Sequence, residues 1–137
     1  MTAKTKKTAV KESKFDFKTI KSFEDACVKE RIDPTQLPDV SMIPDEFKKA
    51  IVNAYKLMII FKAINQGWKP DWSKSSEYKY YPWFKVSPSG VGFSLSGCYD
   101  TYAVTVVGSR LCTDTSEKAL YITEQFEAEY KEFMLYV

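Results

Sequence analysis

Aromatic and basic residues that could bind nucleic acid are concentrated in residues 67–86, GWKPDWSKSSEYKYYPWFKV, which hold all three tryptophans of this 137-residue chain. Proteins that bind single strands stack bases on aromatic rings while cationic side chains meet the phosphates. The candidate stacking rings are Trp68, Trp72, Tyr81 and Trp83, and the candidate phosphate contacts are Lys69, Lys74, Lys79 and Lys85. The alternative is that these rings fill the core, because large aromatic side chains dominate core burial in small domains.

The same stretch carries a loose match to metal-dependent nucleases, with Pro70-Asp71 followed by Glu77-Tyr78-Lys79. In such enzymes two carboxylates hold Mg²⁺ while a lysine stabilises charge at the scissile phosphate. The nuclease pattern places its aspartate on one strand and the ExK residues on the next, and no strand is predicted at Asp71. A motif without its structural context carries little weight, so we expect a protein without catalytic residues.

Arg110 is one of only two arginines and lies between a predicted strand and a predicted helix. A guanidinium there could clamp a phosphate or carboxylate with two parallel hydrogen bonds. The alternative is an ion pair with Asp114 or Glu117 that holds the junction together.

The positive charge of the chain is concentrated at its beginning. Residues 1–14 carry five lysines and one glutamate, a net charge of +4, whereas the remaining residues carry a net charge of −2. We expect residues 1–14 to form a basic flexible tail, in which Lys4, Lys6 and Lys7 are candidate contacts to an anionic partner such as nucleic acid. The alternative is a tail that only keeps the protein in solution.

Residue counts also exclude several kinds of site. The chain has no histidine, which removes Ser–His and Cys–His nucleophile pairs and histidine-ligated metals. Its three cysteines are far apart and form no CxxC pair, so neither a zinc site nor a disulfide framework is expected. We therefore expect no cofactor and no bound metal. No apolar run is long enough to span a bilayer and no secretory signal begins the chain, which favours a cytoplasmic protein without a membrane partner.

Two helices are predicted in the first half of the domain. Residues 15–20 alternate apolar and polar side chains, as in a short half-buried strand or an extended lead-in. Ser22 is a suitable N-cap for a short helix, which Pro34 and Pro38 follow. A second helix is predicted from Pro44 to a left-handed cap at Gly67. Residues 57–61 are apolar on nearly every side of it, so we expect this long helix to be buried.

In the second half of the domain, apolar and polar residues first alternate as in strands and then recur at helical spacing. Strands are predicted at 78–86, 91–96 and 101–107, joined by turns at 87–90 and 97–100. Pro82 cannot donate a ladder hydrogen bond, which favours an edge strand or a bulge. A closing helix is predicted from about Thr115. The sequence therefore predicts one α+β domain over residues 15–137, with a short helix, a long buried helix, a three-stranded antiparallel meander and a C-terminal helix.

Four segments, GWKPDW, YKYYPWF, GFS and GSRLC, resemble a family of short uncharacterised proteins of bacteriophages and mobile elements of gut bacteria. The resemblance spans about residues 15–130 and implies a phage-encoded protein that works in a bacterial host cell or in a virion. We expect a nucleic-acid-associated protein that binds single strands or the backbone through the aromatic and lysine side chains and the tail. The alternatives are a virion or assembly component that contacts other phage proteins, and the Mg²⁺-dependent nuclease. The sequence leaves the oligomeric state open.

Overall fold

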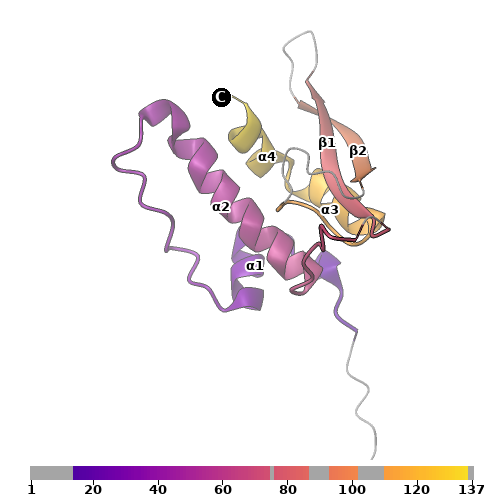
Figure 1. Ribbon diagram of the computed structural model, residues 1–137. Helices are drawn as coiled ribbons and strands as arrows, with labels where there is room; N and C mark the ends of the chain where they lie inside the picture. The colour runs from indigo at the N-terminus through magenta and orange to yellow at the C-terminus, as the bar shows by residue number, and fades with distance from the viewer. Residues whose placement is uncertain (1–13, 75, 87–92, 102–109, 136–137) are drawn as a thin grey trace, which may run out of the picture.

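The computed structural model describes residues 14–74, 76–86, 93–101 and 110–135, without the side chains of 83, 85, 86 and 93–101 (Figure 1). The described elements are, in chain order, the short 3-10 helix η1 (Phe17–Thr19), the helices α1 (Phe23–Glu30) and α2 (Asp45–Asn65), the strands β1 (Lys79–Val86) and β2 (Phe93–Thr101), and the helices α3 (Ser116–Gln125) and α4 (Glu127–Met134).

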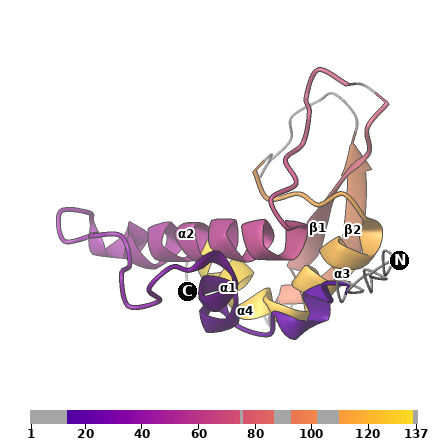
Figure 2. The same cartoon turned by 90° about the horizontal axis from the view of Figure 1, so that it is seen from below.

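The long helix α2 is the central helix of the fold. Helices α1 and α4 pack against it, and α3 packs against the two strands (Figures 1 and 2). The core between these elements consists of Ile20, Phe23, Ala26, Cys27, Leu57, Ile60, Phe61, Ala63, Ile64, Leu111, Ile122, Phe126 and Tyr130. The Tyr121 hydroxyl, 2.8 Å from the Ile20 carbonyl oxygen, ties the start of the domain to α3.

The predicted start of α1 and the predicted start and end of α2 are confirmed, whereas α1 ends earlier than the prolines predict, at a left-handed Arg31. The Ser22 hydroxyl accepts a hydrogen bond from the Asp25 amide at 3.1 Å and caps α1, as an N-cap serine does. Pro44 directly precedes α2. At the other end of α2, Gln66 and Gly67 take positive φ angles of 52° and 78°, so a left-handed turn ends the helix where a glycine was expected to end it.

The two alternatives for residues 15–20, a short strand or an extended lead-in, both miss that Phe17–Thr19 form the 3-10 helix η1. The Asp16 carboxylate accepts a hydrogen bond from the Lys18 amide at 2.9 Å, and the Thr19 hydroxyl donates to the Asp16 carbonyl at 2.7 Å. Local bonds of this kind compete with strand pairing, and a polar/apolar alternation does not reveal them.

The prediction that α2 is a buried helix holds only for its C-terminal half. Leu57 and Ile64 are fully buried, whereas Phe47 and Ile51 are 40% and 39% exposed. Figure 2 shows the reason, since the first turns of α2 extend beyond α1 and the two strands. The first half of the helix therefore presents apolar side chains to solvent.

The predicted three-stranded meander is wrong, because the sheet in the described residues consists of the antiparallel strands β1 and β2 alone. The turn expected at residues 97–100 is part of β2, where Gly97 pairs with Trp83 and Asp100 with Tyr80. Gly97 lies next to a shift of the pairing register between Trp83 and Phe84, which is a β-bulge or irregularity of the ladder. A glycine within a strand often marks a bulge. Residues 87–90 of the other turn and residues 102–107 of the expected third strand lie outside the described residues.

The predicted closing helix starts at Ser116, one residue after the predicted start, and Thr115 is its N-cap. The helix is interrupted at Phe126. Phe126 has φ −118° and ψ 29°, and α4 begins directly after it. The Thr123 hydroxyl donates to the Ala119 carbonyl at 2.6 Å, a contact that bends helices. The bend lets α3 cover the strands while α4 packs against α2 (Figure 1).

Across the described ranges, no helix combines the length and the apolar character that crossing a bilayer requires.

Candidate functional site

A groove of about 430 Å³ lies where the end of α2, the loop after it and the segment before α3 meet. In Figure 2 the loop between α2 and β1 projects away from the helices. The segment before α3 is held at β1 by a pair of backbone hydrogen bonds, from Tyr80 to Thr113 at 3.0 Å and from Thr113 to Tyr80 at 2.7 Å. The residues that line this groove, named here the aromatic groove, are Met58, Phe61, Lys62, Asn65, Gly67, Trp68, Lys69, Pro70, Trp72, Arg110 and Cys112.

The aromatic groove brings together four of the residues predicted to bind nucleic acid. Trp68 and Trp72 are half-buried in its wall, while Lys69 and Arg110 are exposed. None of the described residues that line the groove is acidic. These residues suit an anionic ligand that contains a flat ring, because the tryptophan rings can stack on a ring and the cations can attract a phosphate.

Lys79 does not belong to this surface, because its side chain is fully buried. Its ammonium group donates to the carbonyl oxygens of Asp71 at 2.8 Å and Lys74 at 3.0 Å, and it lies 3.5 Å from the Glu77 carboxylate. The same nitrogen lies 5.1 Å from the centre of the Trp72 ring, within cation–π range. Lys79 therefore holds the loop that carries Trp72 and is not available to a phosphate.

The geometry around Asp71 and Glu77 does not support the nuclease pattern. The Asp71 carboxylate accepts hydrogen bonds from the amide and hydroxyl of Ser73, and these bonds lower its pKa. The Glu77 carboxylate accepts from the Asp71 amide at 2.9 Å. Both acids thus serve the loop backbone, and no group of three potential metal ligands is found in the described part of the chain.

The other predicted contacts are dispersed. Lys74 is exposed but lies outside the groove lining, and Tyr81 is half-buried in β1. Trp83 and Lys85 belong to β1, and their side chains are outside the described part of the structure, as are Lys4, Lys6 and Lys7. Of the predicted contacts whose side chains the structure describes, those that line the groove are Trp68, Lys69, Trp72 and Arg110.

Arg110 lies in the lining of the aromatic groove and is exposed. The alternative considered for it was an ion pair with Asp114 or Glu117. Instead, the Asp114 carboxylate pairs with Lys118 at 2.8 Å, and Arg110 makes no ion pair within the described residues. Its guanidinium therefore remains as a cation at the rim of the aromatic groove.

Sequence reasoning missed the residues that α2 supplies to the groove. These residues are spaced three, one and three positions apart, which places them on one face of the helix. They are Met58, Phe61, Lys62 and Asn65. The apolar residues 57–61 predict a buried helix and so conceal that one of its faces also carries Lys62 and Asn65. The signal that could have revealed it is that Lys62 and Asn65 share a face that ends at the tryptophan-rich loop.

The floor of the groove contains Asn65 and Cys112. The Asn65 side-chain amide donates to the Cys112 carbonyl at 2.7 Å, which fixes the orientation of the amide group. Its Oδ1 is buried and accepts no hydrogen bond from the described residues. Burial raises the pKa of the Cys112 thiol to about 11, so this cysteine is neutral at physiological pH and unsuited to be a nucleophile.

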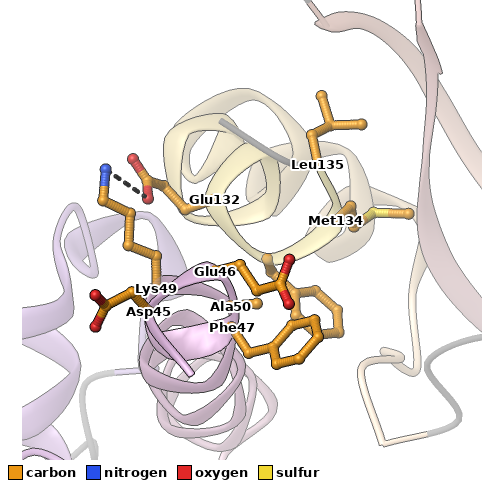
Figure 3. A pocket seen from close by; sticks show the side chains of 9 residues that line it. Asp45, Glu46, Phe47, Lys49, Ala50, Glu132, Met134 and Leu135 are labelled. Carbon is orange, nitrogen blue, oxygen red and sulfur yellow. Dashed lines mark ion pairs between the residues drawn. The ribbon is translucent and has the colours of Figure 1, made fainter. Parts of the chain in front are cut away.

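A second groove, of about 410 Å³, lies between the start of α2 and the end of α4. Figure 3 shows its mixed character, with Phe47, Met134 and Leu135 around it and Asp45 and Glu46 at its edge. The Lys49 ammonium lies 3.9 Å from the Glu132 carboxylate at the rim (Figure 3). Among the described residues that line it, this groove has one lysine, three acidic residues and no tryptophan, so it does not fit a phosphate ligand.

Comparison of this chain with protein-family models, with curated proteins and with solved structures finds no match in any of the three.

Proposed function

We propose that this protein binds single-stranded nucleic acid through the aromatic groove. The observation that carries the proposal is that Trp68 and Trp72 line the same groove as Lys69 and Arg110, with no acidic residue among the described lining. Stacking on tryptophan tolerates every base, and cations next to the rings meet the backbone. The lysines of residues 1–14 add a sequence-independent attraction to phosphates. The resemblance to phage and mobile-element proteins implies that this binding would take place in a bacterial host cell or in a virion.

Fluorescence anisotropy with a labelled single-stranded oligonucleotide tests this proposal. Trp68→Ala removes a ring that lines the groove, whereas Trp72 is the ring that packs against the buried Lys79, so the loop should stay in place. The change should raise Kd about tenfold, since stacking is worth about 1–3 kcal/mol per base. Arg110→Gln should raise Kd severalfold and flatten the dependence of Kd on salt, because one phosphate contact is lost.

Lys74→Gln is the matched control, because it removes an exposed lysine of the same loop that does not line the groove. Its effect on Kd should be much smaller than that of Trp68→Ala. The proposal fails if the oligonucleotide does not bind at low salt, or if the three variants bind equally well.

A second function, assembly through contacts with another copy of the chain, is favoured by the exposed face of α2. Phe47, Ile51 and Met58 are 40%, 39% and 45% exposed and lie on one side of the helix. Exposed apolar rows of this kind mark interaction sites. In an antiparallel pair of α2 helices the acidic start of one, with Asp45 and Glu46, would face the Lys62 end of the other. A twofold axis between identical chains produces such an arrangement.

Size-exclusion chromatography with light scattering tests this second function. The native chain should show a mass that rises with protein concentration towards that of a dimer. Ile51→Glu should keep it monomeric, because a charge would be buried at the centre of the contact. Val28→Glu, on α1 and 79% exposed, is the control and should leave the association unchanged. A native chain that stays monomeric at every concentration contradicts self-association.

A further inference from the structure

We infer that the aromatic groove accepts a single nucleotide unit, a base with its own phosphate, and not a continuous stretch of strand. This inference rests on the proposed function and makes it more specific. The ligand would be a free nucleoside monophosphate or the phosphorylated end of a strand, which share the same chemistry. The inference follows from the size of the groove, the ring that faces it, its floor and its cations.

The size of the aromatic groove is that of a pocket for one small molecule. Its volume of about 430 Å³ lies near the lower end of the range for ligand pockets, which is roughly 300–1,000 Å³. Proteins that follow a strand instead use an extended channel, with about 4–16 nucleotides per binding fold. In the described residues the groove is bounded by α2, by the loop after it and by the segment around Arg110.

Trp72 offers only one face of its ring to a ligand. The buried ammonium group of Lys79 occupies the other face, at 5.1 Å from the ring centre. The hydrogen bonds of that ammonium group to the Asp71 and Lys74 carbonyls fix the loop on both sides of the ring. Trp72 is thus a rigid platform for one base, which can stack on the free face but cannot be followed by a second base on the other.

The floor of the groove has a hydrogen-bond acceptor without a donor. Asn65 is only 6% exposed, and its Nδ2 is committed to the Cys112 carbonyl. Its Oδ1 is shielded from bulk water and lacks a donor among the described residues. Buried acceptors of this kind are rare and often mark a ligand or a bound water. The amino or imino N–H of a base pressed against the floor supplies the missing donor after a small shift of the Asn65 side chain.

The cations at the rim of the groove would bind the phosphate group of the nucleotide. Lys69 and Arg110 are exposed and line the groove, and neither has an ion pair in the described part of the chain. The third cation, Lys62, lies 3.7 Å from the Glu30 carboxylate and is partly neutralised by it. Two free cations match one phosphate group, for which the planar guanidinium of arginine can form two parallel hydrogen bonds.

Competition experiments on the full chain test the inference, with the labelled oligonucleotide as reporter. A nucleoside 5′-monophosphate should displace the oligonucleotide completely and quench tryptophan fluorescence, and the corresponding nucleoside should bind at least about tenfold more weakly because it lacks the phosphate. At a salt concentration that suppresses the attraction between the lysines of residues 1–14 and the phosphates, oligonucleotides of 4 and 20 nucleotides with a 5′-phosphate should bind with similar Kd values. Removal of that phosphate should weaken both if strand ends are the natural ligand, and should change neither if the free nucleotide is.

Two variants connect these results to the groove. Asn65→Leu should weaken binding of the monophosphate severalfold, whereas Gln66→Leu, at the exposed neighbouring position, should not. Arg110→Gln, at an exposed position where folding is not at risk, should weaken the monophosphate more than the nucleoside.

The inference is overturned, and the proposed function retained, if the monophosphate does not compete while affinity rises steadily with oligonucleotide length. It is also overturned if inorganic phosphate competes as well as the monophosphate, because the groove would then bind only an anion. If neither the monophosphate nor any oligonucleotide binds, the proposed function fails as well.

Discussion

Replacing Lys79 with methionine should lower the free energy of unfolding by about 3 kcal/mol, because the fully buried ammonium group is lost and the partly buried oxygen atoms that it contacts lose their donor. Those partners are the carbonyl oxygens of Asp71 and Lys74 and the Glu77 carboxylate, at 2.8, 3.0 and 3.5 Å. Methionine has a similar length and keeps the packing, so the loss reports the charge and its hydrogen bonds. Urea denaturation should show a lower midpoint, and tryptophan emission should shift because the loop around Trp72 loosens.

Lys74→Met is the control in the same loop, since the Lys74 side chain is 66% exposed and its ion pair with Asp71 is long, at 4.0 Å. Its effect should stay below about 0.5 kcal/mol, as for other exposed ion pairs. Glu77→Gln combined with Lys79→Met should cost less than the sum of the two single changes, because both remove the same contact. Equal losses of stability in the two lysine variants would show that Lys79 does not hold the loop.

The start of α1 and both ends of α2 could be predicted because their signals are local. Ser22 as a cap, Pro44 before the first turn and the break at Gly67 each depend on neighbours within a few residues. The strands could be located only in part. The turn expected at residues 97–100 has suitable residues, but pairing with the whole of β1 keeps this segment in the sheet. Whether such a segment forms a turn or a strand depends on its pairing with a distant segment, which local propensity does not reveal.

The candidate site could be predicted only in part for a similar reason. Composition pointed to the tryptophan-rich loop, but it could not separate the lysines by their surroundings. Lys79 is buried, and Lys69 in the same stretch is exposed. Asn65 and Lys62 come to the groove from a helix that was assigned to the core, and Arg110 comes from a segment far along the chain. Such a convergence depends on the tertiary fold, which no spacing rule reports.

Replacing Leu57 with alanine should lower the free energy of unfolding by about 3 kcal/mol, which is typical of a leucine removed from a packed core. Leu57 is fully buried in the part of α2 that contacts the rest of the core. The smaller side chain leaves a cavity that the surrounding helices fill only partly. Urea denaturation should show a lower midpoint with an unchanged slope, because the surface exposed on unfolding stays nearly the same.

Ile51→Ala on the same helix is the matched control, because Ile51 is 39% exposed. At low protein concentration it should cost about 1 kcal/mol or less, since a half-exposed side chain loses little burial and alanine favours the helix. Repeating both denaturations at high concentration separates the two roles of α2. If the exposed apolar face of α2 is a contact between two copies, the loss of unfolding free energy caused by Ile51→Ala should grow with protein concentration, because association stabilises only the native chain. The loss caused by Leu57→Ala should not depend on concentration. Equal costs at low concentration would contradict the division of α2 into a buried half and an exposed half.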